Sequence, residues 1–244
     1  MEEKLTRFKE RFGLPGSVLK IIAIVTMFCD HAGAAVVPLL YRYFPSLDRQ
    51  MMVNLAHIMR RIGRLAFPIF CFLLVEGFLH TRNVRKYALR LFIFALISEP
   101  CFDYCLHHGQ PFWAKQNVYF TLLIGILVLW AIREFNGQVA MQLIVMSAGL
   151  ILAKLLRTDY SYKGVFVIEM LYITRFSPLY QSLCGAAFFE MYEKMPTPLA
   201  FIPVWLYNGK RGRQMKYFYY CFYPAHLLLL GLIAHEILPR MFPL

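Results

Sequence analysis

The adjacent residues Asp30 and His31 interrupt a long apolar run, residues 17–40. A carboxylate and an imidazole surrounded by hydrocarbon are costly unless a partner, a cavity or a chemical role compensates them. Neighbouring residues on a helix point in different directions, so the two side chains face different walls. We expect Thr26, one turn earlier, to donate a hydrogen bond to Asp30 and to leave His31 available as a general base. The alternative is a structural histidine that bonds to a carbonyl of a neighbouring helix.

A second candidate group is the arginine cluster Arg60, Arg61 and Arg64. Arg60 and Arg64 are four residues apart and Arg61 and Arg64 three, so each pair shares one helix face. Such a guanidinium fork suits a carboxylate, a phosphate or a developing oxyanion. Anchoring at a membrane surface explains Arg60 equally well, but not Arg64, which begins the next apolar run. Pro68 is expected to kink that run and to free a carbonyl nearby.

More polar residues occur inside or beside apolar runs, namely Glu76, Arg90, Glu99, Asp103 and Asn117. Glu99 and Asp103 share a helix face, and one of them is expected to be protonated or to pair with Arg64. Glu76 and Arg90 flank a tight loop across which they could pair. Ion pairs that only fix the helix register explain these charged residues equally well.

Basic residues gather in two segments that each follow an apolar run. They are Arg82, Arg85, Lys86 and Arg90 in the first segment and Lys210, Arg211 and Lys216, after the Asn208-Gly209 turn, in the second. A glycine-containing turn among cations can cradle phosphates, although a bias of basic residues to one membrane side explains them too. His226, near the start of the last apolar run, is expected to line the same cavity. The sequence contains no Walker motif, dinucleotide fingerprint or serine elbow.

The elements that would position these residues are membrane-spanning helices. The chain has 244 residues, of which 59% are hydrophobic and 16% charged. This pattern predicts an all-α, polytopic integral membrane bundle of about nine spans, within a range of roughly eight to ten. The expected spans are residues 17–40, 62–80, 87–106, 117–134, 139–156, 163–176, 177–192, 197–207 and 219–238. Residues 17–244 are therefore expected to form one transmembrane domain, with a loop from 41 to 64 between the first two spans.

Charge patterning predicts the orientation of the chain. Residues 1–16 interleave apolar and basic residues, as in an amphipathic helix on a cytoplasmic surface. The positive-inside rule favours a cytoplasmic (inner) membrane location with the N-terminus inside and the C-terminus outside. The net charge of +12 is therefore explained by the orientation of the chain in the membrane. Nucleic acid is not an expected partner, because there is no soluble basic face to hold it. We expect no metal site.

Taken in order, several segments resemble the TraX family of membrane proteins, which is named for the acetylation of conjugative pilin. The matching segments are Met27–His31, Arg61–Phe70, Val75–Asn83, Tyr87–Leu91, Ser98–Asp103, Gln116–Leu122, Thr158–Tyr160, Tyr207–Gly212 and Phe222–His226. That family is similar to the acyltransferase 3 and transmembrane acyl transferase group, in which acyl-CoA enters from the cytoplasm and the acyl group reaches an acceptor on the far side. The resemblance implies a catalytic pair of His31 with Arg61 or Arg64. It also draws attention to Asp159 and Tyr223.

The residues and the resemblance together predict a membrane acetyltransferase that uses acetyl-CoA. His31 would deprotonate an amine or hydroxyl acceptor with support from Asp30, and Arg64 or Arg61 would stabilise the thioester oxyanion. The acceptor stays open between a pilin or other peptide N-terminus, a glycan and a lipid headgroup. A proton-coupled transporter would use the same acidic residues and His31 as a relay. A non-catalytic component of a conjugation or secretion system is the third alternative.

Overall fold

The protein is helical throughout the part that the computed structural model describes, residues 9, 11–44, 46–193, 195–213 and 215–243. Within these residues there is no β-strand, and two isolated bridges, Leu14–Tyr207 and Gln116–Thr158, join segments distant in sequence. The predicted all-α fold is confirmed. Most of the predicted amphipathic segment, residues 1–8 and 10, lies outside the described residues.

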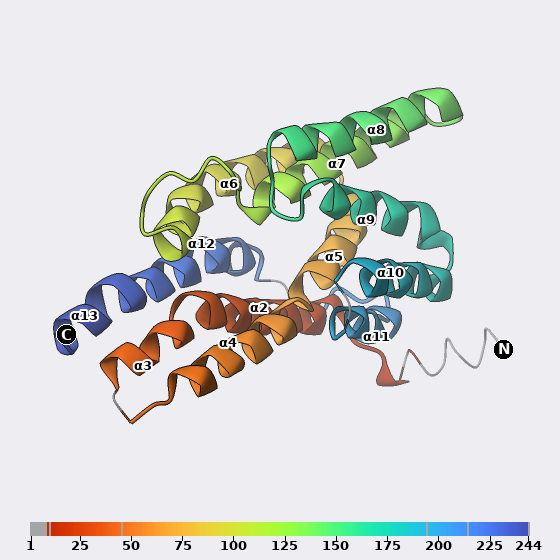
Figure 1. Cartoon of the computed structure of the whole chain (residues 1–244). Helices are drawn as coiled ribbons and strands as arrows, with labels where there is room; N and C mark the ends of the chain where they lie inside the picture. Colours follow the sequence, from red (N-terminus) through yellow and green to blue (C-terminus); the bar gives the residue numbers. More distant parts are fainter. Residues whose placement is uncertain (1–8, 10, 45, 194, 214, 244) are drawn as a thin grey trace.

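Among the described residues, nine helices have 13 or more residues and form the bundle in Figure 1. They are α2 (Gly16–Ala35), α4 (Arg49–Gly63), α5 (Ala66–His80), α6 (Val84–Leu106), α7 (Val118–Glu134), α8 (Val139–Leu155), α9 (Ser161–Ile173), α10 (Pro178–Tyr192) and α12 (Lys216–Leu232). The short helices are α3 (Leu40–Tyr43), α11 (Phe201–Trp205) and α13 (Leu238–Met241). By length and composition, three helical stretches can cross a membrane, Gly16–Tyr43, Arg49–His80 and Tyr217–Met241.

The segment expected to be a loop, residues 41–64, is instead largely helix α4, so that prediction was wrong. Asp48 caps the helix by accepting a hydrogen bond from the Met51 amide at 2.8 Å. Only one face of α4 is buried, through Met52, Ala56 and Gly63. The other face carries polar and charged residues, which lower the mean hydropathy and hide the helix from a search for apolar runs.

Helices α2 and α4 cross closely because small residues face each other at the crossing. A Cβ added to Gly63 would lie 2.6 Å from the Asp30 Cα, and one added to Gly33 would lie 2.8 Å from the Met59 Cβ. Such short approaches are open only to glycine, as at other small-residue helix contacts in membranes. The crossing brings the end of α4, with its arginines, against Asp30 and His31.

Helices α4 and α5 are separated by a two-residue turn, Arg64 and Leu65. Pro68 lies in the first turn of α5, where its missing amide costs nothing but prevents one continuous helix. The expected interruption is therefore present, and it gives Arg64 a place at a helix break. The predicted eighth span is a 3₁₀ turn, Thr197–Ala200, followed by the five-residue α11.

Helix α5 stands in the middle of the bundle, with α6, α7 and α8 above it and α2 and α4 below it in the view of Figure 1. Its side chains Ile69, Cys71 and Val75 are fully buried, as are Val165, Ile168 and Leu171 of α9. This apolar centre fixes the relative positions of the helices whose ends carry the polar residues.

One end of the bundle is built by segments about 190 residues apart in sequence. The Gly16 and Ser17 amides donate to the carbonyls of Lys210 and Arg211 at 2.8 and 3.0 Å. The Arg211 guanidinium donates to the carbonyl of His80 at 3.3 Å. We call this region, formed by the start of α2, the end of α5 and residues 206–213, the basic end.

Candidate functional site

The central feature of the site is a pair of histidines from the two ends of the chain. His31 on α2 and His226 on α12 are both buried, and His31 Nδ1 lies 2.7 Å from His226 Nε2. Their rings stack with centroids 4.9 Å apart, and Tyr223 packs edge-on against His31 at 5.9 Å. The structure thus places His226 beside His31, and not in the cavity of the basic loops as expected.

The hydrogen-bond network assigns the tautomers of this pair. His226 Nδ1 lies 2.7 Å from the Phe222 carbonyl oxygen, which can only accept, so Nδ1 carries the proton. In a neutral imidazole the other nitrogen, Nε2, then accepts. His31 Nδ1 must therefore be the donor, and the lone pair of His31 lies on Nε2. No described group hydrogen-bonds to that Nε2.

The helix that carries His226 is locally shaped by Pro224. Proline removes a backbone donor and leaves the Tyr220 carbonyl without its helical partner. The Tyr119 hydroxyl of α7 replaces that partner at 3.1 Å. This contact ties α12 to α7 about one turn before Pro224 and stabilises the part of α12 that carries Tyr223 and His226.

Asp30 does not have the expected partner. Thr26 donates to the carbonyls of Ile22 and Ala23 in its own helix, at 2.8 and 3.2 Å, so the predicted bond from Thr26 to Asp30 is wrong. A threonine hydroxyl inside a helix reaches the carbonyl one turn back more easily than the next side chain. One oxygen of Asp30, Oδ1, is buried with no hydrogen-bond partner among the described residues.

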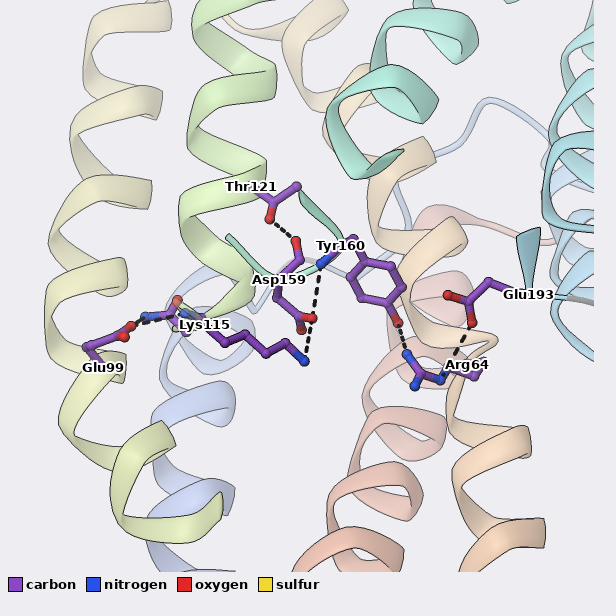
Figure 2. Close-up of polar contacts among 8 residues, drawn as sticks. Arg64, Glu99, Lys115, Thr121, Asp159, Tyr160 and Glu193 are labelled. Atoms are coloured by element: carbon purple, nitrogen blue, oxygen red, sulfur yellow. Dashed lines mark hydrogen bonds and ion pairs between the residues drawn. The ribbon is translucent and has the colours of Figure 1, made fainter. Parts of the chain in front are cut away.

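The three arginines of the cluster separate in the structure. Arg60 and Arg64 line the same cavity as Asp30 and His31, whereas Arg61 is exposed and is not part of that lining. Between Arg61 and Arg64, the structure thus places Arg64 next to the histidines. Arg64 Nη1 donates to the Tyr160 hydroxyl at 3.3 Å, and its Nε lies 3.6 Å from a Glu193 carboxylate oxygen (Figure 2).

A second ion pair stands opposite Arg64. Lys115 Nζ lies 2.9 Å from Asp159 Oδ1, and Figure 2 shows this pair and Arg64 on two sides of the Tyr160 ring. Burial and the neighbouring Asp159 carboxylate raise the pKa of Tyr160, so its hydroxyl remains protonated at neutral pH. The site therefore presents three cationic side chains, Arg60, Arg64 and Lys115, and the phenol of Tyr160 in the same cavity lining as His31.

The loop that carries Asp159 and Tyr160 has an unusual backbone. Arg157, Tyr160 and Ser161 have φ angles of 52°, 61° and 48°, in the left-handed region that L-residues rarely adopt. The loop is held in place by backbone hydrogen bonds with Gln116, at 3.0 and 2.9 Å, and by the Thr121 hydroxyl, which donates to the Asp159 carbonyl. Strain of this kind concentrates at functional sites because the surrounding structure must maintain it.

These polar residues surround a cavity of about 70 Å³, here called the histidine cavity. Its polar lining consists of Asp30, His31, Arg60, Arg64, Lys115, Asp159, Tyr160 and Tyr223. A cavity of about 360 Å³ adjoins it, shares Arg64, Lys115 and Tyr160 with it, and is closed by Phe188 and Phe189 of α10. The histidine cavity can hold a few water molecules or one small acyl group, and the adjoining aromatic cavity has the size of a ligand site.

Glu99, Asp103 and Asn117 do not join the histidine cavity. Glu99 accepts hydrogen bonds from the backbone and side-chain amides of Asn117, and Asn117 also donates to the Ala95 carbonyl at 2.8 Å. Asp103 accepts from the Phe112 amide at 3.3 Å. Of the two alternatives expected for these carboxylates, pairing with Arg64 is not found among the described residues, because Arg64 is bound by Glu193; protonation of one of them stays a prediction.

A large cavity of about 660 Å³ lies at the basic end. Three of the predicted phosphate-binding residues, Arg82, Arg90 and Arg211, line it, together with Lys20 of α2. Glu76 lines it too, but its ion-pair partner is His80 at 3.8 Å and not Arg90. Residues of the two basic segments thus meet at one cavity.

The other predicted phosphate-binding residues have different places. Arg85 does not line this cavity but a smaller one that shares Arg82 with it, and its guanidinium lies 5.7 Å from the Trp130 ring. Asn208 is structural, since its side chain donates to the Gly13 carbonyl and accepts from the Lys210 amide, both at 3.0 Å. Lys86 and Lys210 are exposed outside the described lining of the basic cavity, and the side chain of Lys216 lies outside the described part of the chain.

The comparison with known families decides the identity of the chain. The model of the TraX protein family matches residues 15–234. The chain belongs to the TraX family. A probable fimbrial assembly protein FimC, serogroup H1, from Dichelobacter nodosus is 30% identical over 243 residues, which cover 87% of this chain and 92% of the relative. No solved structure matches the chain. The protein is thus a helical membrane protein of the TraX family.

The sequence did not single out three residues of this TraX-family site, Lys115, Tyr160 and Glu193. Tyr160 stood in a matching segment, and its position next to Asp159 was an available signal. Lys115 and Glu193 follow helices in loops, where isolated charges are common, so no local pattern distinguishes them. Their role became visible only through the ion pairs with Asp159 and Arg64.

Proposed function

We propose that this protein is an acyl-CoA-dependent membrane acyltransferase, most simply an acetyltransferase, in which His31 is the general base. The observation that carries the proposal is the hydrogen-bond geometry of His31, whose Nδ1 is bonded to His226 at 2.7 Å and whose Nε2, the basic nitrogen of the assigned tautomer, has no hydrogen-bond partner among the described residues. A base with a fixed orientation and a vacant lone pair beside a small polar cavity is suited to proton abstraction.

The chemical step uses the residues around the histidine cavity. His31 Nε2 takes a proton from an amine or hydroxyl acceptor while the acceptor atom attacks the thioester carbonyl carbon. The negative charge that develops on the carbonyl oxygen is stabilised by Arg64 or Lys115. The carbon–sulfur bond then breaks, and the CoA thiolate leaves as a thiol with the proton that His31 held.

The donor is proposed to enter from the basic end. The cavity of about 660 Å³ offers Lys20, Arg82 and Arg211 to the phosphates of acyl-CoA. Lys20 and His31 lie on the same helix, 11 residues apart by their numbers, which at about 1.5 Å per residue is roughly 16 Å. The extended pantetheine arm is the part of the donor that would cover this distance along α2.

The acceptor is proposed to reach the site from the opposite side, through the aromatic cavity. The related fimbrial assembly protein suggests a pilin or another peptide N-terminus as the acceptor. An inner-membrane location with the N-terminus inside is part of the same proposal, because it exposes the basic end to cytoplasmic acyl-CoA.

The proposal is tested by following thiol release from acetyl-CoA by the purified protein in detergent. With water in place of the acceptor, the protein should hydrolyse acetyl-CoA slowly. His31→Ala should abolish this hydrolysis, while its affinity for acetyl-CoA, measured by calorimetry, should stay within about twofold of the parent value. His57→Ala, at an exposed position of α4, is the matched control and should keep the parent rate. Proton uptake into proteoliposomes without thiol release would refute the acyltransferase and favour the transporter.

A further inference from the structure

A separate cavity of about 560 Å³ lies where the segment after α6 folds back along that helix. His108 and Gly109 have φ angles of 55° and 76°, and the His107 and Gly109 amides both donate to the Asp103 carbonyl. This turn sends residues 109–116 past the end of α6, as the arch between α6 and α7 in Figure 1. We call this the acidic cavity; its walls are residues 96–104 of α6 and residues 109–116.

The charge of the acidic cavity has one sign. Glu99 and Asp103 line it, and none of the described lining residues is Lys, Arg or His. Lys115 belongs to the neighbouring segment, but it faces the histidine cavity and is bound by Asp159 at 2.9 Å. Burial lowers the pKa of His107, which is adjacent in sequence to α6, so this imidazole adds no cation at neutral pH.

One carboxylate that lines this cavity keeps an acceptor atom without a donor among the described residues. Asp103 is only 8% exposed; its Oδ2 accepts from the Phe112 amide, but its Oδ1 is buried with no partner among the described residues. Pro100 supplies no amide, so the backbone carbonyl of Leu96, another lining residue, loses its helical donor. A buried carboxylate oxygen without a donor is costly, and a positive charge bound nearby offsets that cost without a direct hydrogen bond.

The remaining walls are aromatic. Tyr104, Phe112 and Trp113 line the cavity, and Phe112 is held flat by stacking on His107 with centroids 3.9 Å apart. Trp113 is 79% exposed, as is common for tryptophans at a membrane surface. Aromatic faces attract cations through their quadrupole, and together with carboxylates they form the cages that recognise alkylammonium groups.

We infer that the acidic cavity binds an alkylammonium group, either primary or quaternary. Two ligands share this chemistry, the headgroup of a zwitterionic lipid and the free amino terminus of a peptide. In both cases the ammonium would lie against Asp103 and Glu99 with the aromatic rings around it. The inference stands on residues outside the histidine cavity, so it holds or fails independently of the proposed acyltransferase.

The inference is tested by the fluorescence of Trp113. The chain has three tryptophans, so Trp130→Phe and Trp205→Phe together leave Trp113 as the single emitter. In a neutral detergent, titration with choline should change the Trp113 emission saturably, whereas 3,3-dimethylbutan-1-ol, its uncharged isostere, should not. Asp103→Asn should weaken the choline response at least tenfold.

Glu236→Gln is the matched control, because Glu236 is an exposed carboxylate paired with Arg240 on the same helix turn, and it should leave the response unchanged. Should Asp103→Asn fail to fold, Phe112→Leu removes a ring without removing a hydrogen-bonding side-chain atom and should also weaken choline binding. Equal responses to choline and its isostere, or an unchanged response in these variants, would overturn the inference.

The source of the ammonium group is distinguished by competition. Short-chain phosphatidylethanolamine or phosphatidylcholine should displace choline if the ligand is a lipid, with phosphatidylglycerol as the control that lacks the ammonium. A tetra-alanine peptide with a free amino terminus should displace choline if the ligand is a peptide, and its N-acetylated form should not. Displacement by neither class would refute the site as one for a biological alkylammonium.

Discussion

Replacing His226 by Phe should slow acetyl-CoA hydrolysis about 10- to 100-fold. The new ring can still stack on Phe222, as His226 does at 4.9 Å, but the acceptor 2.7 Å from His31 Nδ1 is lost. A hydrogen bond to the charged imidazolium is worth about 1.5–3 kcal/mol and one to the neutral ring about 0.5–1.5. The difference of about 1–1.5 kcal/mol raises the barrier and slows the reaction about tenfold. Loss of the fixed tautomer adds a further factor.

The assay is thiol release over a range of acetyl-CoA concentrations. We expect kcat to fall and KM to stay within about twofold, because His226 does not line the basic cavity. His226→Gln should restore part of the rate, since its amide oxygen can accept from His31 Nδ1. Nitrogen NMR of histidine-labelled protein should show His31 protonated on Nδ1 in the parent and a mixture of tautomers in His226→Phe.

Two results would refute this reasoning. One is a kcat of His226→Phe within about twofold of the parent value in a protein that folds and binds acetyl-CoA normally. The other is a His31 tautomer that does not change when His226 is replaced. His57→Gln, at the exposed histidine of α4, should change neither quantity and controls for general effects of losing an imidazole.

Three more predictions follow from the geometry. Arg64→Lys should lower the rate of thiol release about 100-fold, because it loses an oxyanion donor. Arg61→Lys, at an exposed position, should change that rate less than twofold. Equal effects of the two substitutions would show that Arg64 does not stabilise the oxyanion. Arg82→Ala should weaken acetyl-CoA binding, measured by calorimetry, about tenfold or more. Arg85→Ala, which does not alter the lining of the large basic cavity, should weaken it less than twofold. A larger loss of affinity in Arg85→Ala than in Arg82→Ala would place the donor site elsewhere. Gly63→Ala should destabilise the protein by about 1–3 kcal/mol by overpacking against α2; an unchanged melting temperature in detergent would contradict the close crossing.

Much of the fold was readable from the sequence because apolar runs long enough for membrane helices are a strong and local signal. The exception was α4, whose polar face hid it, although Met52, Ala56 and Gly63 recur at a spacing typical of one helix face. The interruption near Pro68 was also predictable, since proline cannot donate within a helix.

The candidate site was predictable only as a set of residue types. His31, Asp30, Arg64 and His226 were selected because charged or titratable groups in apolar segments require an explanation. Their partners were not predictable: Thr26 bonds to its own helix, Arg64 pairs with Glu193, and Glu99 holds Asn117. Each of these choices depends on which helix faces which, and sequence spacing does not contain that information.

The sequence by itself determined that this is an all-α membrane protein, which residues interrupt its apolar segments, and that two of its segments after apolar runs are rich in basic residues. Only the tertiary structure decided that His226 and not Asp30 orients His31, and that Arg64 rather than Arg61 stands beside them. The physical reason is that hydropathy is a property of each segment, whereas a hydrogen bond at 2.7 Å between residues 195 positions apart requires the packing of α2 against α12. That packing includes ring contacts such as Phe28 of α2 against His226 of α12, with centroids 6.2 Å apart, which become specific only when the helices meet.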